Sequence, residues 1–133
     1  MKNDKIVLYM HAGSGNHGCE AIVRTTAKML GGPKDVVLWS TGKQEDIAYG
    51  AAAWMEKILV SEELRRFSPG YFEALFRRKL LKQGDANMKV FLKETFRGSV
   101  AISVGGDNYC YPWSARQNAE LNREIRKHCA ATV

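Results

Sequence analysis

Apolar residues fall along this chain in short continuous runs, separated by longer stretches in which apolar positions recur every three or four residues. Runs that do not alternate with polar positions are typical of strands covered on both faces. They predict strands over residues 5–10, 35–39, 57–60, 99–104 and 130–133. The stretches of helical spacing predict helices over residues 19–30, 44–49, 71–82, 85–97 and 114–128, the last with Ser114 as its N-cap.

Alternation of strands with helices predicts parallel pairing and an α/β fold. We therefore expect a Rossmann-like, doubly wound parallel sheet. The chain has 133 residues, which suits one domain over residues 1–133. With 45% hydrophobic and 26% charged residues, its composition is that of a globular domain and not of a disordered or fibrous chain.

The two ends of the chain carry further expectations. The sequence stops inside the apolar run 130–133, so we expect it to be a fragment of a longer protein. The early apolar run, residues 6–10, is far shorter than the ~20 residues of a membrane-spanning helix, and no signal-peptide cleavage site follows it. We therefore expect a cytoplasmic protein, either free or peripheral at the inner face of the membrane.

Positive charge is concentrated in one segment. The formal net charge is +6, and residues 64–82 hold six bases against one acid. Such a patch favours anionic partners. The helix predicted there either packs its apolar side on the sheet with a solvated basic face, or lies on an anionic membrane surface. Nucleic acid is not expected, because no nucleic-acid-binding motif accompanies the patch.

The cysteines do not indicate a disulfide framework or a metal centre. Cys19, Cys110 and Cys129 are scattered and form no CxxC pair, so free thiols are expected. His11 and His17 lie near Cys19, but their spacing fits no common zinc pattern. We interpret these residues as lining a turn, and we expect no bound metal.

A glycine-rich loop follows the first predicted strand. Gly13, Gly15 and Gly18 satisfy G-x-G-x-x-G and precede a predicted helix, as in a dinucleotide site. The carboxylate that would hold a ribose after the second strand is missing, because Trp39 and Ser40 stand there. Two interpretations stay open from these residues. The loop belongs to an NAD(P)- or FAD-binding module of an oxidoreductase, or its glycines only form the turn.

A second loop follows the strong apolar run 99–104. Gly105 and Gly106 precede Asp107, which would bring a carboxylate close to a ligand at the end of a strand. Asp107 is suited to accept a proton from a sugar hydroxyl, or alternatively to cap a turn. The aromatic residues that follow offer flat amphipathic surfaces for sugar rings, or cover the sheet edge: Tyr109, Tyr111 and Trp113.

Together, "GSGNHGCEAIVRTT" in the first loop and "SVGGDNYCY" in the second resemble the polysaccharide pyruvyl transferase family. The two motifs occur in that family's order, and the resemblance spans nearly the whole chain. It implies the N-terminal part of a two-domain architecture similar to the GT-B glycosyltransferases. It also implies Asp107 as the catalytic base and the following substrate-binding residues: Gly13, Ser14, Gly15, Asn16, His17, Gly18, Glu20, Gly105, Gly106, Asn108 and Tyr109.

The activity implied by the resemblance is transfer of a pyruvyl group from phosphoenolpyruvate to a sugar of a cell-surface polysaccharide or its precursor. The acceptor would be a sugar or a lipid-linked oligosaccharide, with phosphoenolpyruvate as the donor substrate and no further cofactor. Family members hold the donor through Arg and His residues of a C-terminal domain, which this sequence lacks. We therefore expect the chain to supply the acceptor side of the cleft and to be inactive alone.

Three functions thus remain in competition: pyruvyl transfer, dinucleotide binding in an oxidoreductase, and non-catalytic docking of glycans or membrane. Pyruvyl transfer requires that the two glycine loops meet at one edge of a parallel sheet, where ligands of α/β proteins bind.

Overall fold

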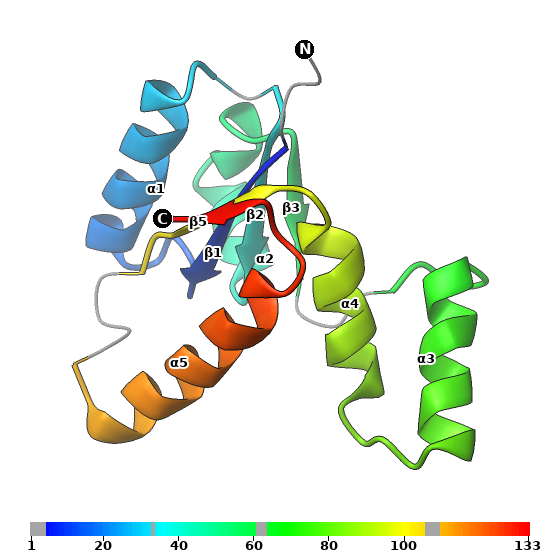
Figure 1. The fold of residues 1–133 in the computed structure, drawn as a ribbon. Coiled ribbons are helices and arrows are strands. Elements are labelled where there is room, and N and C mark those ends of the chain that lie inside the picture. Colours follow the sequence, from blue (N-terminus) through cyan, green and yellow to red (C-terminus); the bar gives the residue numbers. More distant parts are fainter. Residues whose placement is uncertain (1–4, 33, 61–63, 106–109) are drawn as a thin grey trace.

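The structure is a computed structural model that describes residues 5–32, 34–60, 64–105 and 110–133. Within these residues, a parallel sheet of five strands forms the centre of the molecule (Figure 1). The strands are β1 (Ile6–His11), β2 (Val36–Ser40), β3 (Lys57–Leu59), β4 (Val100–Ser103) and β5 (Ala131–Thr132). Their order across the sheet is β3-β2-β1-β4-β5, and each neighbouring pair is parallel. This confirms the predicted α/β class, and the strand order is that of a Rossmann-like fold.

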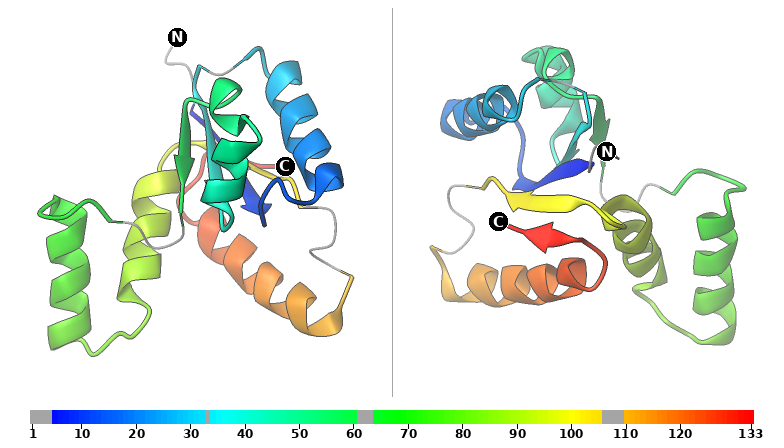
Figure 2. Two further views of the ribbon diagram at one scale, coloured as in Figure 1. Left: turned by 180° about the vertical axis from the view of Figure 1, so that it is seen from behind. Right: turned by 45° about the horizontal axis from the view of Figure 1, so that its top comes forward.

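Helices cover both faces of the sheet, as the uninterrupted apolar strands predicted (Figure 2). One face carries α1 (His17–Met29), α2 (Lys43–Ala48) and the short 3₁₀ helix η1 (Ala51–Ala53). The other carries α4 (Ala86–Phe96) and α5 (Pro112–Arg126). No helix of the described residues is both long and apolar enough to cross a membrane.

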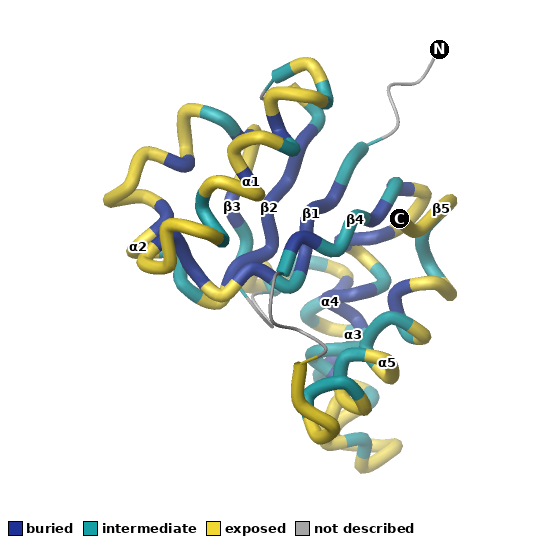
Figure 3. The backbone as a smooth tube through the Cα atoms, turned by 90° about the vertical axis from the view of Figure 1, so that its left-hand side faces the viewer, coloured by how far each residue is buried: buried dark blue, intermediate teal, exposed yellow. Residues whose placement is uncertain are grey.

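Each face has its own apolar core, because successive strand side chains point to opposite sides. Leu8 and Leu38 belong to the core beneath α1, whereas Val7 and Val37 belong to the core beneath α4 and α5. All five residues of β2 are buried, and Figure 3 shows β1 and β2 as the most deeply covered part of the backbone. The sheet is therefore a rigid platform for the loops at its edge.

Two helix starts differ from the prediction because of local capping. Helix α1 begins at His17 and not at residue 19, since the Asn16 side chain accepts hydrogen bonds from two backbone N–H groups of the first turn. Ser114 is not the N-cap of α5. The helix begins at Pro112 with Tyr111 as its N-cap, and the Ser114 hydroxyl donates to the Tyr111 carbonyl at 2.9 Å.

The packing of α3 (Pro69–Leu80) differs more from the sequence prediction than the helix starts do. Of the two placements predicted for its apolar side, packing on the sheet is wrong, because α3 lies against the outer side of α4, away from the sheet (Figure 1). The other placement, on a membrane surface, stays a prediction. The small residues Gly70 and Ala74 are buried, whereas Phe72 and Phe76 are more than half exposed. A face of small residues allows the backbone of α3 to approach α4 closely, and the larger apolar side chains are left in solvent.

Candidate functional site

The two glycine loops leave neighbouring parallel strands at the same edge of the sheet. Strand β1 pairs with β4 through Tyr9 and Ser103, and both strands run toward this edge. The loop after β1 leads to α1 on one face, and the loop after β4 leads to α5 on the other. The chain order reverses between these two strands, which is the position where open parallel sheets bind ligands. The structure thus brings Gly15 and Gly105, one glycine of each motif, to one edge of the sheet.

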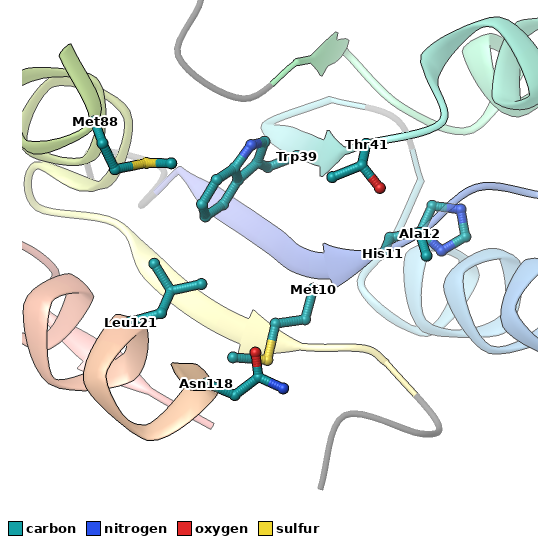
Figure 4. Close-up of a pocket in the computed structure, with 8 residues that line it drawn as sticks. All are labelled: Met10, His11, Ala12, Trp39, Thr41, Met88, Asn118 and Leu121. Atoms are coloured by element: carbon teal, nitrogen blue, oxygen red, sulfur yellow. The ribbon is translucent and has the colours of Figure 1, made fainter. Parts of the chain in front are cut away.

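The end of β1 is kinked at this edge. Met10 has a φ of 64°, a left-handed conformation that is uncommon for a residue other than glycine. The register between β1 and β2 shifts between Leu8 and His11. At this kink the Met10 side chain lies beside Asn118 of α5 (Figure 4), and its sulfur accepts a 3.3 Å hydrogen bond from Ser103 Oγ of β4. His11 is directed instead toward Asp46 of α2. Such backbone strain is concentrated at functional sites in proteins.

His11 belongs to a buried polar cluster together with Asp46 and Ser14. His11 Nε2 lies 2.9 Å and Ser14 Oγ 2.6 Å from the same oxygen, Asp46 Oδ1. All three residues are at most 2% exposed. Ser14 donates its hydroxyl proton to this oxygen, and His11 donates to it in the tautomer that carries the ring proton on Nε2. The cluster, called here the Asp46 cluster, fastens the loop after β1 to helix α2.

The order of the three groups excludes one kind of chemistry for the Asp46 cluster. In a Ser-His-Asp triad the imidazole lies between the hydroxyl and the carboxylate and removes the hydroxyl proton. Here the carboxylate lies in the middle, and the Ser14 hydroxyl is directed to it. His11 Nδ1 and Asp46 Oδ2 have no hydrogen-bond partner among the described residues. The arrangement fits a structural clamp with spare hydrogen-bonding capacity, not a nucleophile with its base.

The backbone donors of the glycine loop are already engaged by this chain's own side chains. The Gly15 N–H donates to Glu45 Oε2 at 3.2 Å, and the N–H groups of Gly18 and Cys19 donate to Asn16 Oδ1. In a dinucleotide site these donors face the pyrophosphate. A pyrophosphate would therefore have to displace Glu45 or Asn16 to reach these three N–H groups.

Close packing explains two of the glycines. Gly13 has a φ of 120°, which glycine adopts without strain, and a Cβ there would lie 2.6 Å from Glu45 Oε2. A Cβ on Gly42 would lie 2.7 Å from the Gly13 Cα. The loops after β1 and β2 therefore touch backbone to backbone at this edge.

The remaining predicted residues of the first loop differ in their exposure. Gly15, Asn16, His17 and Gly18 are exposed, whereas Gly13 and Ser14 are buried. His17 lies edge-on to the Tyr49 ring and has Nδ1 3.3 Å from Glu20 Oε2. The exposed part of this loop is thus available to a ligand, and Ser14 is instead committed to Asp46.

Of the second loop, the structure describes Gly105 and the aromatic residues that open α5. The residues Gly106, Asp107, Asn108 and Tyr109 lie outside the described residues, so their predicted roles stay predictions. Tyr111 and Trp113 stack with ring centroids 6.1 Å apart and planes 15° from parallel, and both are exposed by more than half. They form an accessible aromatic pair next to the second motif.

No protein-family model, curated protein or solved structure matches this chain.

Two pockets lie at the edge where the motifs meet. One, of about 320 Å³, lies between the ends of β1 and β2 and the helices α4 and α5 (Figure 4). Met10, Trp39 and Leu121 give it a mainly apolar lining, and Thr41 and Asn118 add polar groups. The other, of about 460 Å³, lies at the ends of β4 and β5 and includes Gly105, Asn122 and Arg126.

The second pocket has the more polar chemistry. Asn122 accepts a 2.8 Å hydrogen bond from the Tyr9 hydroxyl, which fixes its orientation, and Arg126 brings a positive charge. Hydroxyls and anionic groups are the ligand groups that such a lining favours. Among the described residues no group of three or more His, Cys, Asp or Glu side chains is placed to bind a metal ion.

The sequence interpretation missed Asp46 and Glu45. Both lie in the first turn of α2, directly after β2, the neighbour of β1. Their position in the sequence could have indicated them, because acidic side chains that directly follow the neighbouring parallel strand lie at the same edge of the sheet as the glycine loop. His11, which we interpret from the sequence as lining a turn, lies in the Asp46 cluster.

Proposed function

We propose that this chain forms the acceptor side of a polysaccharide pyruvyl transferase, an enzyme that transfers pyruvate from phosphoenolpyruvate to a sugar. The observation that carries the proposal is the placement of the two motif loops after adjacent parallel strands β1 and β4, at one edge of the sheet. In this proposal the fold is the N-terminal half of a GT-B-like enzyme, and the donor is held by residues of a second domain.

The chemistry requires groups on both sides of a cleft. A general acid protonates the methylene carbon of phosphoenolpyruvate, and the adjacent carbon becomes electrophilic. One sugar hydroxyl bonds to that carbon and gives its proton to a base. A second hydroxyl of the same sugar then displaces the phosphate, which leaves with the second proton, and a cyclic ketal results. In this scheme Asp107 is the base, and a positioned base of this kind contributes roughly a hundred- to ten-thousand-fold to the rate.

Surface chemistry near the second motif supports a carbohydrate acceptor. The exposed pair Tyr111 and Trp113 offers an aromatic face on which a sugar ring can stack, while its hydroxyls stay in water. The polar pocket beside Gly105 offers Asn122 and Arg126 for hydroxyls or acidic substituents of the sugar. Both features lie along the loop and helix that follow β4.

The dinucleotide alternative has less support from the same geometry. The N–H groups of Gly15 and Gly18 donate to side chains of the chain itself. The buried hydroxyl of Ser40 stands at the end of β2, where a ribose-binding carboxylate would be needed. A pyrophosphate would have to displace Glu45, whose negative charge would otherwise repel it.

The proposal is tested by measuring phosphate release from phosphoenolpyruvate, using the protein at the length its gene encodes. Release that depends on a saccharide with two suitably spaced hydroxyls is the expected result, together with a ketal on that saccharide. Asp107→Asn is expected to lower the rate at least a hundredfold, whereas Asp85→Asn, an exposed control on α4's N-cap, leaves it unchanged. Undiminished transfer by Asp107→Asn would instead assign the loop a binding role only.

The aromatic pair provides a second, independent test of acceptor binding. Trp113→Ala is expected to raise the KM for the saccharide by about five- to tenfold with little change in kcat, because the ring contributes to binding and not to chemistry. Met29→Ala is the matched control, since Met29 is 82% exposed at the far end of α1. Equal KM values for both variants would remove the pair from the site.

A further inference from the structure

The outer face of α3 leaves large apolar side chains in solvent. Phe72, Phe76 and Leu80 are spaced four residues apart and are 53%, 57% and 66% exposed. Phe67, which precedes the helix, is 76% exposed and lies against Phe72 with ring centroids 6.5 Å apart. These side chains form one stripe along the side of α3 opposite its contact with α4. A contiguous apolar surface of this kind marks an interaction site.

Helix α3 is built to hold this stripe in place without help from the sheet. Ser68 caps its N-terminus, with the Tyr71 N–H donating to Ser68 Oγ at 3.1 Å, and Pro69 stands in the first turn. On the inner side, Glu73 accepts hydrogen bonds from Lys93 of α4 at 3.0 and 3.1 Å. The helix is therefore anchored through its inner face, and the outer face is not needed for folding.

Basic side chains flank the stripe. Lys79 and Lys82 are exposed, and no ion pair joins either of them to a carboxylate within the described part of the chain. Two more exposed bases, Arg65 and Arg66, directly precede Phe67. By contrast, Arg77 faces inward and pairs with Glu73 at 2.8 Å. Over the described residues 64–82, the outward charge is therefore almost wholly positive.

We propose that this outer face of α3 docks the protein on an anionic lipid bilayer. The mixture of Phe and Leu with exposed Lys and Arg is that of a helix lying in a membrane interface, with apolar side chains inserted and bases at the headgroups. A protein partner is less well matched, because Lys is depleted from the centres of protein interfaces, and Lys79 adjoins the apolar stripe. The long aliphatic stem of Lys79 can bend so that its ammonium group reaches the headgroups, and the apolar side chains beside it can still insert into the bilayer. The proposal does not depend on pyruvyl transfer.

Vesicle sedimentation with the purified protein tests this assignment. The protein is expected to pellet with vesicles of phosphatidylcholine and phosphatidylglycerol, and to remain in solution with phosphatidylcholine alone. Binding is expected to weaken when the ionic strength rises from 0.1 to about 0.5 M, because screening shortens the reach of the bases. Equal binding to both vesicle types, or to neither, would overturn the proposal.

Matched variants separate the stripe from general surface effects. Phe72→Ser combined with Phe76→Ser is expected to lower the partition coefficient at least about tenfold, while Met29→Ser, at another exposed apolar position, does not change it. Lys79→Glu is expected to lower it by about tenfold, and the exposed Lys28→Glu on α1 by much less.

Measurements without lipid check that the variants fold and whether a second copy of the chain covers this face instead. Circular dichroism and melting temperature should be the same for all variants, since the altered side chains are exposed. Sedimentation velocity without lipid should give a monomer. A dimer that Phe72→Ser combined with Phe76→Ser dissociates would assign the face to a second copy of the chain and overturn the proposal.

Discussion

Replacing Asp46 with alanine tests whether the Asp46 cluster holds the edge of the sheet together. The carboxylate is fully buried and accepts hydrogen bonds from His11 and Ser14, which are themselves 2% and 1% exposed. Without it, two buried donors lose their partner, and each such loss costs about 1–3 kcal/mol. The unpaired oxygen Asp46 Oδ2 is removed at the same time, which offsets part of this cost. We expect a net loss of roughly 2–4 kcal/mol in the free energy of unfolding.

Urea unfolding followed by circular dichroism measures this effect. With a denaturant slope of about 2 kcal/mol per M, in the middle of the usual range, the loss should move the unfolding midpoint down by roughly 1–2 M. Glu45→Ala is the matched control, because Glu45 precedes Asp46 on the same helix but is exposed and, among the described residues, accepts a 3.2 Å hydrogen bond from the Gly15 N–H alone. Its midpoint should move by less than about 0.5 M. Equal midpoint shifts for the two variants would show that the Asp46 cluster stabilises the fold no more than the exposed Glu45 carboxylate does.

Two further predictions concern the packing of the edge and of α3. Gly42→Ala places a Cβ 2.7 Å from the Gly13 Cα and should cost about 1–3 kcal/mol in unfolding experiments, whereas Gly84→Ala meets nothing within 4 Å and should be near neutral. Hydrogen bonding from Lys93, more than any other cause, lowers the pKa of Glu73 below its usual 4.5. The wild type should therefore exceed Glu73→Gln in stability by at most about 1 kcal/mol above pH 4.5, with the advantage shrinking as the pH falls below that value. An advantage that grew on acidification would contradict the ion pair.

Much of the fold follows from local sequence. A residue such as Val37, within an uninterrupted apolar run, has only one environment that covers it fully, a strand between two layers of helices. The alternation of strands and helices then restricts the pairing to a parallel sheet. The predicted helix ends were less accurate. Helix α1 starts earlier than predicted, because the Asn16 side chain accepts hydrogen bonds from N–H groups of the first turn even though Gly18 lies in that turn.

The position of α3 was not predictable from its periodicity. The spacing of Phe72, Phe76 and Leu80 reveals an apolar side, but not which surface covers it. The contact with α4 instead uses Gly70 and Ala74, whose small size permits close approach. Helix–helix packing through small residues gives a weak hydropathy signal, so the pattern pointed to the wrong side of the helix.

The candidate site was predictable only in part. Placing both motifs after adjacent strands follows from parallel topology, and the structure has this arrangement for Gly15 and Gly105. The link from His11 to Asp46 spans 35 positions and depends on the kink at Met10, which no local pattern reveals. The role of Asp107 stays a prediction of the resemblance.

The most direct measurement of the central claim is an amide-resonance titration of the isotopically labelled chain with the acceptor saccharide. If the two motif loops form one acceptor site, the resonances of Gly15, His17 and Gly105 should shift together and give a single dissociation constant. NAD, NADP and FAD should leave them unchanged. Shifts confined to one loop, or saturable binding of a dinucleotide at Gly15, would contradict a shared acceptor site at this edge of the sheet.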